Sequence, residues 1–148
     1  MPTFSMRSES TLSTCHEDLQ RLFREVVKSR DCMILNEGGY RGKEVQDRLV
    51  AEGKSKNPFP TSKHNCYPSH AVDVAAYHKT IPHVDWTDEY AFYYFAGYVQ
   101  RVADELGIKI RYGGDWDRDC EMDDQTFFDL VHFELIFDGG NREQDVEV

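Results

Sequence analysis

The sequence predicts an α+β domain in which helices pack against a small, mainly antiparallel sheet. Helical and extended patterns follow one another irregularly along the 148 residues, without the regular strand–helix–strand repeats that build parallel sheets. A chain of this length buries roughly two thirds of its unfolded surface, which is enough for one hydrophobic core. We therefore expect one domain over residues 1–148, with its core at about 12–137 and polar termini.

The N-terminal part of the chain predicts a helix followed by a strand. Residues 11–28 repeat apolar side chains at helical spacing, and Ser13 or Thr14 is a suitable cap for the first turn. Residues 32–35 form a short apolar run that leads into a glycine-containing turn, which is typical of a strand.

The middle of the chain predicts a short helix, a loop and a strand. Residues 43–52 form the helix, which ends at Gly53. Residues 55–69 are rich in Pro, Ser, Asn and Lys and therefore predict a loop. The strand at 71–76 places Asp73 on one face and His70 on the other, because successive side chains of a strand alternate.

The last third predicts the main packing helix and two further strands. Thr87 or Asp88 caps a long amphipathic helix that stops at Gly107. The remaining expected segments are a strand at 108–112, an acidic loop at 113–125, a strand at 131–137 and a polar, frayed tail at 139–148.

Composition excludes several classes of function. The formal charge is −10, from 27 acidic and 17 basic residues, so nucleic acid is not an expected partner. No apolar run approaches the roughly 18 residues that cross a bilayer, and residues 1–13 lack the pattern of a signal peptide. We expect a protein made without a leader that does not insert into membranes. The four cysteines lack CxxC spacing and predict free thiols in a reducing compartment.

Three side chains from distant segments have the chemistry of a zinc site. His64, Asp73 and His132 offer the nitrogen and oxygen ligands that zinc binds, and three protein ligands leave one position for water. Asp129, three residues before His132, is free to act as the general base for that water. Arg41 is a candidate to polarise a scissile carbonyl or to bind a substrate carboxylate.

These residues lie in elements that resemble the zinc peptidase family of D-Ala-D-Ala carboxypeptidases and L-alanyl-D-glutamate endopeptidases, which share the hedgehog/DD-peptidase fold. The similarity is greatest to small single-domain phage enzymes. The elements come in the order of the family and cover roughly residues 12–137. They are Glu-Gly-Gly-Tyr-Arg at 37–41, Gly-Lys-Ser-Lys at 53–56, Ser-Lys-His-Asn at 62–65, Pro-Ser-His-Ala-Val-Asp at 68–73, Gly-Gly-Asp-Trp-Asp at 113–117 and Asp-Leu-Val-His-Phe-Glu-Leu at 129–135.

The resemblance implies a role for each candidate residue. His64, Asp73 and His132 would bind zinc, Asp129 would be the general base, and Arg41 resembles the carbonyl-polarising arginine of the family. Three departures are visible: the gap between His64 and Asp73 is longer than in the compact form of the motif, Ser69 replaces a common glycine, and Val131 replaces a common proline. The longer gap is typical of the phage subgroup.

The resemblance also implies a function. We expect a zinc peptidase that cleaves peptidoglycan stem peptides as a monomeric phage endolysin, most simply between L-Ala and D-Glu, and that collects in the host bacterial cytoplasm before lysis. A D-Ala-D-Ala carboxypeptidase remains an alternative within the enzyme class. A non-catalytic, zinc-stabilised wall-binding or phage structural domain is the alternative outside it, although a structural zinc needs no spare base such as Asp129.

Other reactive residues are interpreted as structural. His16, His78 and His83 belong to no cluster, and the strand pattern turns His70 away from Asp73. Cys66 and Cys120 lack the spacing of a thiolate metal site or a nucleophile. The carboxylates between Asp115 and Asp124 predict a solvated loop, with a weak calcium site as the alternative. Trp116 either lines the substrate cleft or closes the core, and the sequence leaves both open.

Overall fold

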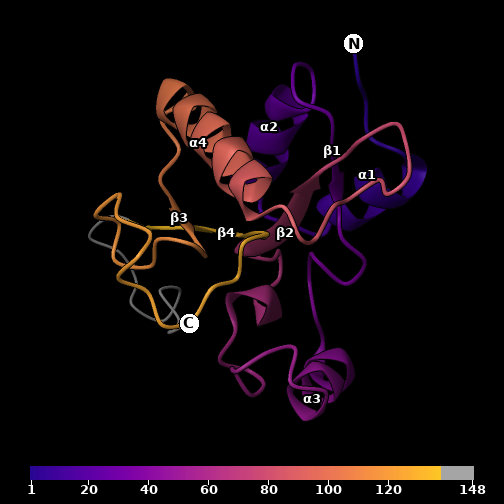
Figure 1. The fold of residues 1–148 in the computed structure, drawn as a ribbon. Coiled ribbons are helices and arrows are strands. Elements are labelled where there is room, and N and C mark those ends of the chain that lie inside the picture. The colour runs from indigo at the N-terminus through magenta and orange to yellow at the C-terminus, as the bar shows by residue number, and fades with distance from the viewer. Residues whose placement is uncertain (138–148) are drawn as a thin grey trace.

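The computed structural model describes residues 1–137, and these residues form an α+β fold with four α-helices and a four-stranded sheet (Figure 1). The sheet order is β1-β2-β4-β3, and all three pairings are antiparallel. This confirms the predicted fold class, while the tail expected at 139–148 lies outside the described residues. The elements are α1 (Met6–Leu12), α2 (Glu17–Val26), β1 (Cys32–Ile34), α3 (Lys43–Ala51), the 3₁₀ turn η1 (Lys63–Asn65), β2 (Ala71–Ala76), α4 (Glu89–Leu106), β3 (Ile110–Tyr112) and β4 (His132–Leu135).

The prediction of one helix over residues 11–28 is wrong for the first part of that range. Helix α1 covers a polar stretch that the sequence did not indicate as helical, and α2 begins only at Glu17, capped by the His16 ring, which accepts a hydrogen bond from the Asp18 N–H at 3.0 Å. The residues between them pair with Ser69: the His16 N–H donates to the Ser69 carbonyl at 2.8 Å, and the Ser69 N–H donates to the Thr14 carbonyl at 2.9 Å. This long-range backbone pairing takes 13–16 out of the helix.

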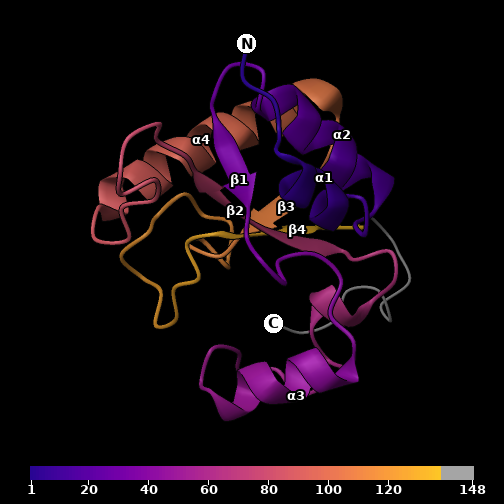
Figure 2. The same cartoon turned by 90° about the vertical axis from the view of Figure 1, so that its right-hand side faces the viewer.

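Helices α2 and α4 cover one face of the sheet, and α3 and η1 lie on the other side (Figure 2). The apolar stripes of α2 and α4 pack with inward-facing side chains of β2 and β4 in one buried core. Members of this core include Leu19, Leu22, Phe23 and Val26 from α2, Phe95, Val99 and Val102 from α4, and Val72, Val74 and Phe133 from the sheet. Because side chains alternate along a strand, the residues between these positions face away from the helices.

The later elements follow the predictions closely. Strand β2 covers 71–76 as expected, and α4 begins after its Asp88 cap and ends at Gly107, which adopts a left-handed conformation with φ of 71°. The strands expected at 108–112 and 131–137 are shorter than predicted. Strand β3 starts late because the Ile108 N–H still bonds back to the end of α4, at Ala103. No helix within residues 1–137 combines the length and the apolar character needed to cross a membrane.

Candidate metal centre and active site

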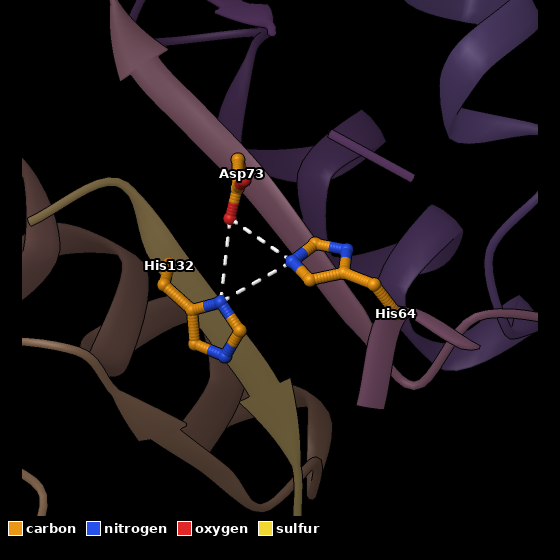
Figure 3. Close-up of side chains that lie close together, drawn as sticks. All are labelled: His64, Asp73 and His132. Atoms are coloured by element: carbon orange, nitrogen blue, oxygen red, sulfur yellow. Dashed lines mark hydrogen bonds and ion pairs between the residues drawn. The ribbon is translucent and has the colours of Figure 1, made fainter. Parts of the chain in front are cut away.

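The three predicted ligands meet at one point beside the sheet (Figure 3). His64 Nε2, His132 Nδ1 and Asp73 Oδ1 form a triangle in which each of the three sides is 3.3 Å. All three residues are buried. Zinc bonds of about 2.0–2.1 Å in a tetrahedral site place neighbouring ligand atoms about 3.3–3.4 Å apart. The spacing of the three atoms therefore fits a tetrahedral zinc ion that keeps one open position.

The fold positions each ligand by local structure. Asp73 on β2 and His132 on β4 are direct partners in the antiparallel register, so their side chains project from the same face. His64 lies in η1, which is held by a capping box: the Ser62 hydroxyl accepts from the His64 N–H at 3.2 Å, and the Asn65 side chain accepts from the Ser62 N–H at 3.1 Å. Two strands and one capped turn thus bring the ligands together.

Hydrogen bonds on the outer side of each ring fix the histidine tautomers. His64 Nδ1 donates to the Gly39 carbonyl at 2.8 Å, and His132 Nε2 donates to Glu134 Oε1 at 2.7 Å. The other ring nitrogen of each histidine is then left to bind a cation. Asp73 Oδ1 is buried and accepts no hydrogen bond within the described part of the chain. Three acceptor atoms that face one another in this way are suited to hold a cation between them.

The electrostatics of the site show how its charges balance when no metal is bound. Burial lowers the pKa of His132, but the neighbouring carboxylates of Asp73 and Glu134 outweigh it and raise the pKa to about 10. Burial lowers the pKa of His64, which keeps that ring neutral. Burial also opposes ionisation of Asp73, yet its histidine and arginine neighbours hold its pKa well below the usual range. Without metal, a proton on His132 therefore supplies the positive charge.

Arg41 contacts the predicted metal ligand Asp73 directly. Its Nη2 donates to Asp73 Oδ2 at 2.8 Å and its Nε donates to the Glu37 carbonyl at 2.7 Å, with the side chain 12% exposed. The guanidinium thereby turns Asp73 Oδ1 towards the histidines. Among residues 1–137, Arg41 Nη1 has no hydrogen-bond partner. The sequence predicted a substrate role for Arg41 and missed its contact with the ligand.

Asp129 lies next to the three ligands without joining them. Its Oδ2 is 3.8 Å from His132 Nδ1, and its side chain is 36% exposed. Burial, followed by the charge of Asp73, raises the pKa of Asp129 to about 6. The loop that carries Asp129 packs so closely on Gly113 that a Cβ there would lie 2.0 Å from the Asp129 carbonyl oxygen. Gly113 is thus required for the position of this carboxylate.

A buried charge network behind the ligands was not predicted from the sequence. Glu134 is fully buried and holds His132 through one carboxylate oxygen. Its other oxygen lies 3.1 Å from Lys63 Nζ and 2.8 Å from Arg111 Nη2. Lys63 is 1% exposed and precedes His64 in the chain, so the network joins the two histidine-bearing segments. The available signal was a glutamate that alternates with apolar residues along β4.

A cavity of about 540 Å³ opens onto the ligands. Trp116 forms part of its wall: the ring stacks on Phe127, and its centroid is 5.5 Å from that of His132. The Trp116 Nε1 donates to the Phe127 carbonyl at 2.8 Å. Trp116 therefore lines the cavity and anchors the loop, and it does not belong to the buried hydrophobic core of residues 1–137.

The remaining reactive residues lie outside the centre. His70 packs on Phe137 with ring centroids 4.9 Å apart, as its strand parity predicted. All four cysteines are free thiols. The carboxylates of Asp115, Asp117 and Asp119 lie within 4.8 Å of one another. Asp117 and Asp119 are exposed, as a solvated loop predicts, while Asp115 is buried and accepts two backbone N–H bonds. A calcium site in this loop stays a prediction.

Comparisons with known proteins find similar peptidases. The family described as phage L-alanyl-D-glutamate peptidase matches residues 2–136. The L-alanyl-D-glutamate peptidase of Escherichia phage T5 is 29% identical over 137 residues, which cover 90% of this chain and 97% of that protein. The crystal structure of the Serratia marcescens L-Ala D-Glu endopeptidase ChiX superposes with a TM-score of 0.67 at 28% identity, and the match covers 92% of each chain.

Proposed function

The chain belongs to the phage L-alanyl-D-glutamate peptidase family, and from this premise we propose that it hydrolyses the L-Ala–D-Glu amide bond of peptidoglycan stem peptides as an endolysin. The observation that carries the proposal is the triangle of His64, Asp73 and His132 with the separate carboxylate of Asp129 beside it. We place the protein in the host cytoplasm before lysis, acting as a monomer on the cell wall.

We assign zinc to the three ligand atoms, because their 3.3 Å spacing, their tautomers and their mixed nitrogen and oxygen donors all fit that ion. A bound zinc ion would supply an electrophile that brings the pKa of water towards ~7 and withdraws charge from a carbonyl oxygen. The protein residues then have to hold the substrate in place and move protons.

Asp129 is the proposed proton carrier. At neutral pH a carboxyl group with a pKa of about 6 is mostly ionised, so it can accept a proton from the attacking water. The same raised pKa allows it to return that proton to the amine of the D-glutamyl leaving group. Its partial exposure and its place in the cavity wall leave room for both partners.

Arg41 has two proposed tasks. Its Nη2 fixes the orientation of the ligand carboxylate of Asp73. Arg41 also lines the cavity, and its Nη1, which has no hydrogen-bond partner among residues 1–137, would donate to the carbonyl oxygen as negative charge develops there. The charge of an arginine persists across the working pH range, which suits both tasks.

The test is mass spectrometry of purified peptidoglycan digested by the zinc-loaded protein. We expect amino sugars that carry only L-Ala, together with new peptides that begin with D-Glu. Asp129→Asn should keep zinc and lose turnover by about 10²–10⁴-fold, whereas His132→Ala should lose both. Asp123→Asn, an exposed carboxylate of the neighbouring loop, is the matched control and should retain activity. Loss of terminal D-Ala alone, or no product at all, would contradict the proposal.

A further inference from the structure

The cavity beside the proposed metal centre is lined by a lysine, Lys56, that has no acidic partner among residues 1–137. Three cationic side chains line this cavity: Arg41, Lys54 and Lys56. Arg41 is paired with Asp73, and Lys54 Nζ lies 3.3 Å from a carboxylate oxygen of Glu52. Lys56 forms no ion pair with any carboxylate in residues 1–137. In a chain of net charge −10, an unneutralised lysine at the active-site cavity requires an explanation.

The position of Lys56 is set by an aromatic wall. Its Nζ lies 4.2 Å from the centroid of the Phe127 ring, and Phe127 stacks on Trp116 with an interplanar angle of 9°. Trp116 in turn lies against the metal ligand His132. A cation–π contact orients the ammonium group without cancelling its charge. The aromatic wall of Trp116 and Phe127 therefore has the metal centre at one end and, at the other, the positive charge of Lys56, which can bind an anion.

Lys56 also lies where the main cavity meets a second one. It lines both the cavity of about 540 Å³ and an adjoining one of about 450 Å³, together with Asn57, Trp116 and Phe127. A stem peptide that follows the aromatic wall away from the metal centre would approach this junction, because an extended chain advances about 3.3–3.6 Å with each further residue. The flexible stem of an exposed lysine allows its ammonium to follow a bound group.

The substrate of the proposed function has an anion that needs such a partner. In an L-Ala–D-Glu amide, the nitrogen belongs to glutamate, which has two carboxyl groups. Only one of them continues the peptide, so the other stays free on the leaving-group side, and the C-terminal carboxylate of the stem lies farther along that side. Acidic groups of the cavity such as Asp129 would repel these anions. A positive charge on this side would offset that repulsion.

We propose that Lys56 binds a carboxylate of the stem peptide on the D-glutamyl side of the cleaved bond, and so determines the preference for an acidic substrate. The inference rests on the proposed function. It adds that Lys56 recognises one carboxylate of the substrate. It makes Lys56 a specificity residue with no part in proton transfer or metal binding.

The experiment compares three synthetic stem peptides: the free acid, a peptide amidated at the free carboxyl of D-Glu, and a peptide amidated at its C-terminus. Each is tested with wild-type protein and Lys56→Gln. Lys54→Gln is the matched control, since it removes the same charge from the same cavity at a lysine already paired with Glu52. Zinc content is measured for all three proteins and should be equal.

We expect Lys56→Gln to raise KM for the free acid by about five- to twentyfold with kcat nearly unchanged. Amidation of the recognised carboxyl should raise KM of the wild-type protein by a similar factor and should not raise KM of Lys56→Gln any further. The peptide that shows this pattern identifies which carboxylate is bound. If both amidated peptides affect the wild type and Lys56→Gln equally, the inference is wrong.

A binding measurement separates this inference from the proposed function. Calorimetric titration of the three peptides into Asp129→Asn and into Asp129→Asn/Lys56→Gln measures recognition without cleavage. A preference for the free acid that depends on Lys56 would support the inference even if the wild type cleaved none of the peptides, in which case the proposed function alone would fail. Equal affinities of both proteins for all three peptides would overturn the inference.

Discussion

Replacement of Glu134 by glutamine tests whether the buried charge network holds the metal centre together. Glu134 is fully buried, with partners at 2.7 Å on His132, 3.1 Å on Lys63 and 2.8 Å on Arg111. The neutral amide has nearly the same shape but removes the negative charge that faces the Lys63 ammonium and the Arg111 guanidinium. Removal of one partner from a buried ion pair destabilises a protein by about 3–5 kcal/mol.

The structure places the expected loss near the lower end of that range. Lys63 Nζ also donates to the Leu135 carbonyl at 3.1 Å, and the side chain of Arg111 is 27% exposed, so water replaces part of its interaction. We therefore expect Glu134→Gln to lower the free energy of unfolding by about 3 kcal/mol. His132 also loses its charged acceptor, which should weaken zinc binding by about 10–100-fold.

Two assays keep these effects apart. Urea unfolding with a chelator present measures the free energy of unfolding of the metal-free protein, and competition with a chromophoric chelator measures zinc affinity. Glu105→Gln is the control, since this glutamate forms an exposed ion pair with Arg101 and should change stability by less than about 0.5 kcal/mol. A loss below about 1 kcal/mol in Glu134→Gln would refute the reasoning, as would unchanged zinc affinity.

The other predictions concern the ligands and the base. Arg41→Ala should reduce kcat/KM by about 10²–10³-fold and weaken zinc binding, and an unchanged zinc affinity would show that Arg41 does not fix the ligand carboxylate. Zinc binding at pH 8 should release about one proton, because metal-free His132 stays protonated below its pKa of about 10; calorimetry in two buffers of different ionisation enthalpy measures this. Gly113→Ala should displace Asp129 and abolish turnover with zinc retained. Its control, Gly97→Ala on α4, has an open Cβ position and should stabilise the protein by about 0.5–1 kcal/mol.

Periodicity predicted the elements that depend on local sequence. Strand β2 has the predicted residues, and alternation along it placed Asp73 and His70 on opposite faces before their surroundings were known. The cap at Asp88 and the stop at Gly107 bound α4 as expected. The helix at 11–28 failed because its interruption comes from pairing with Ser69, a residue far along the chain that a local window does not include.

The site residues also divide into those that local sequence predicted and those that depend on long-range contacts. Residue types and motif order brought His64, Asp73, His132 and Asp129 together as candidates, and the structure places all four at one cavity. The sequence did not predict Glu134 and Lys63 as site residues, because a lone glutamate or lysine usually lies at the surface of a protein. Their burial depends on an ion pair between residues 71 positions apart, which only the folded chain reveals.

The direct pairing of Asp73 with His132 makes the metal centre sensitive to how β2 and β4 align. A shift of one residue between these strands would carry His132 to the face covered by helices and bring Phe133 to the ligand side. An ion that binds only the correctly aligned strands stabilises them over every misaligned form, by an amount that grows with its free concentration. Metal that is available during synthesis would thus favour the correct alignment of β2 and β4 before the protein binds any substrate.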